Sequence, residues 1–444
     1  MEITYICHAC LLIKINGIKI LTDPWLVGPT FANNHFIFPQ PKLTPEEVGV
    51  VDFIYFSHGH EDHLQIESIE RLNKKNKNSQ IIIPNFSESW VEDDLKSLGF
   101  SKINKIDNHA TLNLKKNLWI KMFINDLGDI DSSILIKSNK NEVFFQTDNL
   151  MSKKEAIYIG KNHNISVAFL QSTLTGIFPG FFELDKQTMY QASIKKRQRS
   201  HDMAINYSKF INPKYVVPYA CDQIQYGELY YANELHRGNK GEFSRQLIKE
   251  TKNKIKPIIL ESCDKIFLQN NKISKLTINK VSYTKNIEKK FLINQHKHSD
   301  KLAMSSWAAS MTKEFRKYLK IEKKYILKDY NNDLNKFKKK LKHSLKLWTK
   351  SKFNVCIVVF DELKDKYFHI YLNYGIKNNK IKKNKIDLTV EIPTYRMQNL
   401  IRGEYNMGIT ALSSGGMRIS RPTMNYTANE KFFWKLLEKI NFNN

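Results

Sequence analysis

The segment Ser57–His63, with the sequence Ser-His-Gly-His-Glu-Asp-His, holds three imidazoles and an aspartate in the spacing H-x-H-x-D-H. Imidazole nitrogens and carboxylate oxygens are the ligands that suit zinc, iron and manganese. His58 and His60 can face one ion, while Asp62 and His63 fall on the next turn of the chain and can face a second. Separate surface or core histidines are an improbable alternative for four ligand-type residues so close together. The segment therefore predicts a metal centre.

The elements that must position this centre are short strands separated by turn residues, with helices between them. An apolar run over residues 50–56 predicts a buried strand that leads into the histidine-rich loop. The pair Asn16-Gly17 predicts a hairpin turn in the opening strands. Further strands are predicted at 3–10, 10–15, 18–21, 81–84, 103–106, 118–123, 133–136, 142–146, 167–170 and 214–217, and helices at 64–73 and 90–98. This pattern favours a mixed α/β sandwich.

A chain of 444 residues is too long for one compact core. Beyond residue 265, Lys and Asn become dense while Gly and Pro become scarce, as at a domain junction. We therefore expect a metal-binding domain over 1–265, a connecting segment over 266–300 and an α+β domain over 301–444. Within the last domain the sequence predicts helices at 305–319, 332–347 and 395–402, strands at 355–360, 368–372 and 387–393, a Gly-rich turn at 413–416 and a terminal helix through Trp434.

The formal net charge of +26 raises the possibility of nucleic-acid binding. Lys outnumbers Arg about six to one, however, and the chain is also rich in Asn and Ile, a pattern that an AT-rich genome imposes on any protein. We therefore regard nucleic acid as an unlikely main partner. A positive surface would still steer an anionic small molecule toward the predicted centre.

The remaining composition favours a cytoplasmic protein. No apolar run is long enough to cross a bilayer, and the first residues lack the basic region and cleavage site of a signal peptide. Five scattered cysteines make no disulfide framework. Cys7 and Cys10 flank His8, but no second cysteine pair completes a zinc knuckle, so buried strand residues are the better interpretation.

The spacing H-x-H-x-D-H after a buried strand resembles the metallo-β-lactamase superfamily. The segments 5–17 and 22–26 are similar to the opening hairpin of ascorbate-phosphate lactonase-like proteins and of the CMP-N-acetylneuraminate hydroxylase family. The segments 130–136, 147–149, 176–179 and 215–220 resemble the second half of that hydroxylase family, and the Trp434 segment matches it more loosely. The resemblance implies a metallo-β-lactamase-type αββα sandwich, an α/β fold, followed here by an additional C-terminal α+β domain. Residues 387–418 resemble sterol-carrier-like domains, which would serve as a lid or dimerisation piece; an ordinary small α/β domain is the alternative.

Carried over residue by residue, the resemblance implies two divalent metal ions, which would be zinc, iron or manganese. His58 and His60 would bind the first ion, Asp62 and His63 the second, and Asp148 would bridge the two. An acidic residue after the buried strand at 142–146 is costly unless a cation meets it. A helix N-cap is the alternative for Asp148.

His8 would lie beneath the histidine-rich loop Ser57–His63, called the metal loop below, and would orient a ligand through its free ring nitrogen, although a packed core histidine is equally compatible with the sequence. Two further histidine ligands that are usual in the superfamily are absent. Asp126 or Asp129 is the candidate substitute for the first of them, with His109 and His236 as more remote candidates. The last is missing from the segment 218–222, which reads Pro-Tyr-Ala-Cys-Asp. A carboxylate-rich centre favours iron or manganese over zinc.

The leading hypothesis is a metal-dependent hydrolase that uses a metal-activated water on an anionic ester, lactone or phosphodiester, with Asp62 as ligand and proton acceptor. The runner-up is an iron-dependent monooxygenase of the CMP-N-acetylneuraminate hydroxylase type that acts on a nucleotide sugar. That hypothesis needs a separate electron-transfer protein, because the sequence lacks the two Cys-His pairs of a Rieske cluster. A non-catalytic binding module is the third reading.

Substrate choice is assigned to loops at 31–41, 173–182 and 200–207, which have no decodable sequence pattern. Lys196, Arg197 and Arg199 are candidates to contact phosphate or carboxylate, or else belong to an exposed basic helix. A homo-oligomer is compatible with the sequence.

Overall fold

The computed structural model describes residues 1–31, 35–86, 91–127, 131–173, 179, 184, 186–225, 239–278, 330–345, 353–361, 366–374, 386–393, 397, 400–401 and 418–420. These residues form two large sheets, a two-stranded sheet and a separate four-stranded sheet. Within them, no helix is both long and apolar enough to cross a membrane.

The first large sheet has eight strands in the order β17-β16-β1-β2-β3-β5-β6-β7. Its first three strands in the sequence form two antiparallel hairpins, and Asn16 and Gly17 turn the second one with φ of 50° and 78°, as the sequence predicts. From β3 to β7 the strands are parallel. The strands are β1 (Glu2–Cys7), β2 (Cys10–Ile15), β3 (Ile18–Thr22), β5 (Phe53–Tyr55), β6 (Gln80–Pro84), β7 (Ile103–Ile106), β16 (Lys265–Gln269) and β17 (Lys272–Thr277).

The second large sheet has seven strands in the order β15-β13-β12-β11-β10-β9-β8. The strands from β11 to β15 are parallel, so their carboxyl ends lie at the same edge. They are β8 (Thr111–Lys115), β9 (Leu118–Ile124), β10 (Ser132–Ser138), β11 (Asn141–Phe145), β12 (Val167–Gln171), β13 (Tyr215–Tyr219) and β15 (Lys256–Pro257). The short strands β4 (His35–Ile37) and β14 (Gln223–Gln225) pair separately.

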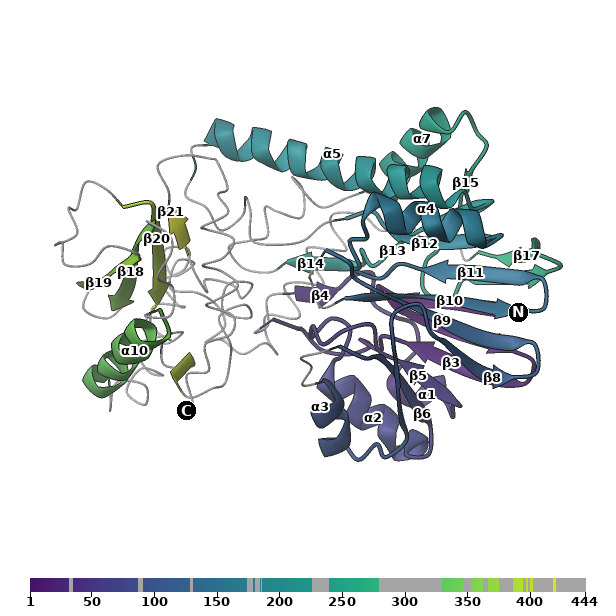
Figure 1. Ribbon diagram of the computed structural model, residues 1–444, viewed down its shortest axis with the longest axis horizontal. Helices are drawn as coiled ribbons and strands as arrows, with labels where there is room; N and C mark the ends of the chain where they lie inside the picture. The colour runs from purple at the N-terminus through teal and green to yellow at the C-terminus, as the bar shows by residue number, and fades with distance from the viewer. Residues whose placement is uncertain are drawn as a thin grey trace.

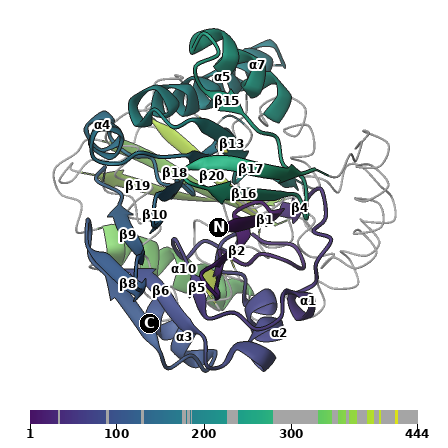
Figure 2. The ribbon, with the colours of Figure 1, turned by 90° about the vertical axis from the view of Figure 1, so that its right-hand side faces the viewer.

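Three hydrophobic clusters give the layer order. One joins the facing sides of the two sheets, with Ile13 from the first and Phe169 from the second. The outer face of the first sheet packs on helices α1, α2 and α3, and that of the second on α4, α5 and α7. Figures 1 and 2 show the two helical layers on opposite sides of the sheets. The helices are α1 (Pro45–Val48), α2 (Ile66–Asn76), α3 (Val91–Ser97), α4 (Lys153–Asn162), α5 (Lys186–Ile211) and α7 (Lys240–Glu250). The αββα sandwich is thereby confirmed.

The C-terminal part contains a four-stranded sheet in the order β19-β18-β20-β21. Its elements are α10 (Tyr330–Leu345), β18 (Phe353–Asp361), β19 (Lys366–Tyr374), β20 (Leu388–Pro393) and β21 (Arg418–Ser420). The helix and first three strands match the expected elements, whereas the expected helix at 305–319, the turn at 413–416 and the terminal helix lie outside the described residues. Strands β16 and β17 extend the first sheet to Thr277, so this sheet continues beyond the boundary expected at residue 265.

One expectation about the loops is wrong. Residues 200–207 lie inside helix α5, not in a loop, and five of them are buried, namely Ser200, His201, Ala204, Ile205 and Tyr207. Most of the loop expected at 173–182 lies outside the described residues. Lys196, Arg197 and Arg199 lie in α5, but Lys196 is half-buried, unlike the exposed basic helix given as the alternative for these residues.

Candidate metal centre

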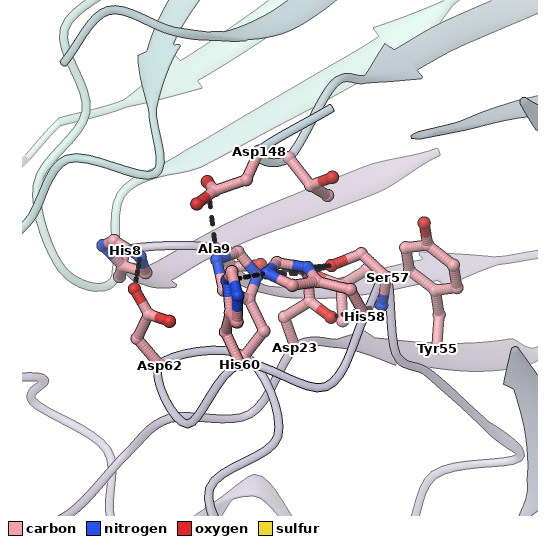
Figure 3. A network of polar contacts seen from close by, with 12 residues as sticks. His8, Ala9, Asp23, Tyr55, Ser57, His58, His60, Asp62 and Asp148 are labelled. Carbon is pink, nitrogen blue, oxygen red and sulfur yellow. Dashed lines mark hydrogen bonds and ion pairs between the residues drawn. The ribbon is translucent and has the colours of Figure 1, made fainter. Parts of the chain in front are cut away.

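The fold brings the predicted ligands together at one end of the two sheets. The metal loop follows β5 of the first sheet, and Asp148 follows β11 of the second. His8 lies in the turn between β1 and β2. Figure 3 shows Asp148 facing the metal loop from the opposite side, with His8 and Asp62 at one flank. The side chains that approach one another therefore come from both sheets of the sandwich.

A buried carboxylate, Asp23, orients the metal loop. Its Oδ1 accepts a hydrogen bond from the Ser57 backbone N–H at 2.8 Å, and its Oδ2 accepts one from Ser57 Oγ at 2.8 Å and one from His63 Nδ1 at 2.9 Å. Because the Ser57 hydroxyl proton is used, His58 Nδ1 is the donor in its 2.9 Å contact with Ser57 Oγ. His58 therefore presents an unprotonated Nε2 to the centre, and Asp23 fixes the Nδ1 side of the His63 ring so that its Nε2 faces the same way.

The first group of potential ligands is His58, His60 and Asp148, whose ligand atoms lie within 4.8 Å of one another. The distance between His58 Nε2 and His60 Nδ1 is 2.8 Å. His58 is buried, whereas His60 is exposed and the Asp148 side chain is 18% exposed. This group therefore lies on the open side of the centre.

The second group is His8, Asp62 and His63, again within 4.8 Å, and all three are buried. His8 Nε2 lies 3.5 Å from Asp62 Oδ2. Asp148 connects the groups, because its Oδ1 lies 3.5 Å from His63 Nε2. The same oxygen accepts a 2.7 Å hydrogen bond from Gln171 Nε2. Asp148 does not cap α4, since the N-cap of that helix is Ser152.

The electrostatics of the centre favour the neutral form of His58 and the ionised form of Asp62, as metal binding requires, but also the protonated form of His63, whose proton a metal ion would displace. Burial, together with the neighbouring His63 and His60, holds the pKa of His58 well below its usual range. Burial alone would raise the pKa of Asp62, but the imidazoles of His63 and His8 outweigh burial and lower it. The pKa of His63 is raised because Asp148, Asp23 and Asp62 outweigh the effect of burial.

The second group also fits a cation because of the atoms it leaves unsatisfied. Within the part of the chain that the structure describes, both ring nitrogens of His8, Oδ1 of Asp62 and Nε2 of His63 are buried without a hydrogen-bond partner. Buried polar atoms without partners cost free energy, and several converging at one point are unusual unless an ion satisfies them. The imidazole and carboxylate atoms present are suitable ligands for zinc, iron or manganese.

The expected substitutes for the missing histidines do not reach this centre. The Asp126 carboxylate accepts hydrogen bonds from the backbone N–H and the hydroxyl of Ser152, at the start of α4. His109 Nε2 pairs with Glu155 Oε1 at 3.1 Å. Neither residue belongs to the two groups. Asp129 and His236 lie outside the described residues.

Sequence reasoning missed two side chains near the centre. Asp131, just before β10, places Oδ1 3.5 Å from His58 Nε2, where an additional ligand was expected. His35 of β4 is buried, and burial lowers its pKa to about 4 while Asp62 raises it and His8 lowers it, so His35 lies in the same electrostatic environment. His8 was expected behind a ligand, but its geometry is that of a potential ligand itself. Asp131 precedes a predicted strand, which was the available signal.

Residues 2–166 match a family model described as the beta-lactamase superfamily domain. The matched segment contains His8, the metal loop and Asp148.

Curated relatives confirm the resemblance to the hydroxylase family. A CMP-N-acetylneuraminic acid hydroxylase from Danio rerio is 25% identical over 279 residues, covering 59% of this chain and 43% of that protein. A protein from Mycolicibacterium smegmatis, whose name places it with Rieske 2Fe-2S iron-sulfur proteins, is 26% identical over 227 residues, covering 50% of this chain and 43% of the relative. The chain thus spans less than half the length of these relatives.

Among solved structures, Igni18, a metallo hydrolase from Ignicoccus hospitalis, is similar with a TM-score of 0.41 and 18% identity over 60% of this chain and 97% of the other. CmlA, a diiron β-hydroxylase from Streptomyces venezuelae, has a TM-score of 0.41 and 18% identity over 58% and 52% of the two chains.

Proposed function

We propose that the protein is a metal-dependent hydrolase that acts on an anionic ester, lactone or phosphodiester. The observation that carries this proposal is the convergence of two ligand groups on Asp148, which lies within 4.8 Å of His58 and His60 and 3.5 Å from His63. Two divalent cations held there would polarise the substrate and lower the pKa of a bound water.

The residues of the chain divide the work between a deep and an open side. Asp62, His63 and His8 would hold one ion in the buried part, with Asp23 fixing the His63 ring from behind. His58, His60 and Asp148 would hold the other where the substrate enters, since His60 and Asp148 are the accessible members. The lowered pKa of Asp62 favours its role as a permanently ionised ligand and counts against its expected second role as a proton acceptor.

A second candidate function is an iron-dependent monooxygenase acting on a nucleotide sugar. It is favoured by the carboxylates around the imidazoles, namely Asp62, Asp148 and, at 3.5 Å from His58, Asp131. The hydroxylases among the curated relatives point the same way. This function would also need a source of electrons.

Elemental analysis of protein from iron-supplemented cells, combined with turnover assays, tests both candidates. Hydrolysis of anionic esters, lactones or phosphodiesters under argon, by protein containing zinc or manganese, would support the hydrolase. Bound iron with strictly oxygen-dependent turnover would replace it with the oxygenase. Protein that retains no transition metal at a stoichiometric level would rule out both and leave a binding module.

A further inference from the structure

The His8 turn is held by the segment that lacks the usual last histidine. The backbone N–H of Ala220, just after β13, donates to the His8 carbonyl at 3.1 Å, and the Tyr219 hydroxyl donates to the Ala9 carbonyl at 2.8 Å. His8 and Ala220 both have positive φ, of 42° and 51°. Non-glycine residues hold this conformation only where the surroundings enforce it.

A buried polar network lies directly behind this turn. The Tyr5 hydroxyl lies 2.6 Å from Asp222 Oδ2 and 3.2 Å from the His8 carbonyl oxygen. Lys240 Nζ lies 2.6 Å from Asp222 Oδ1 and donates to the Leu260 carbonyl at 3.2 Å. The phenol has one proton, and the shorter distance assigns it to Asp222. The Tyr5–Asp222 hydrogen bond thus anchors the segment after β13, whose Ala220 N–H holds the His8 carbonyl.

The network joins several distant elements around the turn. Tyr5 belongs to β1, Lys240 begins α7, and the Asp222 carbonyl accepts a 3.1 Å hydrogen bond from the Phe38 N–H beyond β4. Tyr5 and Asp222 are both buried, with 0% and 4% of the residue surface exposed, so water does not compete for these hydrogen bonds. Burial and the Asp222 charge raise the pKa of Tyr5 well above 10, which keeps the phenol protonated.

We propose that Tyr5, Asp222 and Lys240 form a positioning network that fixes the His8 turn and so directs the His8 imidazole toward Asp62 and His63. The inference rests on the proposed metal-dependent function. Asp222 holds the Tyr5 hydroxyl, and Lys240 supplies the charge that allows a carboxylate to be buried there. The chain thereby uses the segment after β13 to position a ligand on the other sheet instead of contributing one itself.

The test is a double-mutant cycle on the full chain, read out as manganese affinity. Bound Mn²⁺ per chain would be measured against free Mn²⁺, with the electron paramagnetic resonance signal of a coupled pair reporting the second ion. Tyr5→Phe is expected to weaken Mn²⁺ binding at the second group about tenfold and to leave the affinity of the first group within twofold of the wild-type value. His8→Ala is expected to weaken it more, and adding Tyr5→Phe to His8→Ala should cause no further loss, because Tyr5 acts through His8.

Tyr207→Phe is the matched control. The Tyr207 hydroxyl is also buried and donates to a backbone carbonyl, that of Met151, at 2.7 Å, and neither residue belongs to a ligand group. Both Phe variants should lower the thermal midpoint of the chelator-treated protein to a similar extent. Manganese affinities of Tyr5→Phe equal to those of Tyr207→Phe, or independent losses in the double variant, would overturn the positioning role alone. Failure of the wild-type protein to bind a second ion would overturn the proposed function as well.

Discussion

One buried or half-buried carboxylate lies at each end of strand β11, and the two carboxylates have different partners. Glu142 lies at the amino end, where Lys137 Nζ is 2.6 Å from its Oε1 and the Asn164 N–H donates to its Oε2 at 2.8 Å. Asp148 lies beyond the carboxyl end and faces the imidazoles of the metal loop. At one end the Lys137 ammonium pairs with the carboxylate, whereas at the other end the carboxylate faces imidazole nitrogens of the metal loop.

This contrast separates a structural acid from a candidate ligand. Burial would raise the pKa of Glu142, but hydrogen bonds from His163 and Lys137 outweigh it and lower the pKa to about 2. At the other end, Asp148 Oδ1 accepts a hydrogen bond from Gln171 and lies 3.5 Å from His63 Nε2, which is buried without a hydrogen bond among the described residues. A buried acid alone does not indicate a metal; a buried acid beside unsatisfied imidazoles does.

The largest expected effect comes from removing the imidazoles that face Asp148. The double variant His58→Ala/His60→Ala removes two of the three potential ligands of the first group, so metal content should fall and turnover should drop by roughly three orders of magnitude. Elemental analysis and the hydrolysis assay measure both. His163→Ala, which removes an imidazole from the Glu142 end, is the control and should keep its metal. Full metal content in the double variant would refute the assignment.

If the proposed ions are bound, removing them should destabilise the protein, because they would satisfy buried atoms of the second group. An ion present at one hundred times its dissociation constant stabilises the folded state by about 2.7 kcal/mol. Chelation should therefore lower the thermal midpoint by roughly 5–10 °C, and added Mn²⁺ or Zn²⁺ should restore it. Glu142→Gln protein should show the same shift, because its changed end holds no ion. An unchanged midpoint after verified metal removal would contradict this expectation.

The Glu142 end should respond to acid instead. Its folded-state pKa of about 2 lies below the ordinary value of 4.5, so its contribution to stability is complete above pH 4.5 and is lost as the pH falls toward 2. Urea unfolding should find Glu142→Gln about 2 kcal/mol less stable than the wild type at pH 6, and the difference should narrow by about 1 kcal/mol at pH 3.5. A difference that does not change with pH would show that the ion pair contributes nothing.

The sequence predicted those parts of the fold whose local pattern agrees with their environment. The buried strand before the metal loop and the Asn16-Gly17 turn follow from short-range rules. Strand β8 was missed because its residues are exposed or half-buried throughout. Helix α5 was misread over 200–207 because its buried face includes Ser200 and His201, which hide the apolar periodicity.

For the candidate site, the sequence supplied the cluster but not its surroundings. Residues His58 to His63 are adjacent in the chain, and Asp148 ends a recognisable strand, so both could be singled out. Asp131 and His35 approach the centre only through the packing of separate elements, which no spacing rule encodes. The ligand-like geometry of His8 likewise depends on a turn held from the other sheet.

Asp126, a third carboxylate beside the second sheet, gives the test with the smallest expected effect of whether hydrogen bonding distinguishes a structural acid from a metal ligand. Asp126 was expected as a ligand, but it binds the backbone N–H of Ser152, the N-cap of α4, at 2.9 Å. Asp126→Ala should therefore cost about 1 kcal/mol in urea unfolding, as the loss of a bond at a helix start does, and leave metal content unchanged. Asp148→Asn should instead reduce metal content. If Asp126→Ala lost metal as Asp148→Asn does, the centre would extend beyond the two groups, and hydrogen bonding to α4 would not distinguish a structural acid from a ligand.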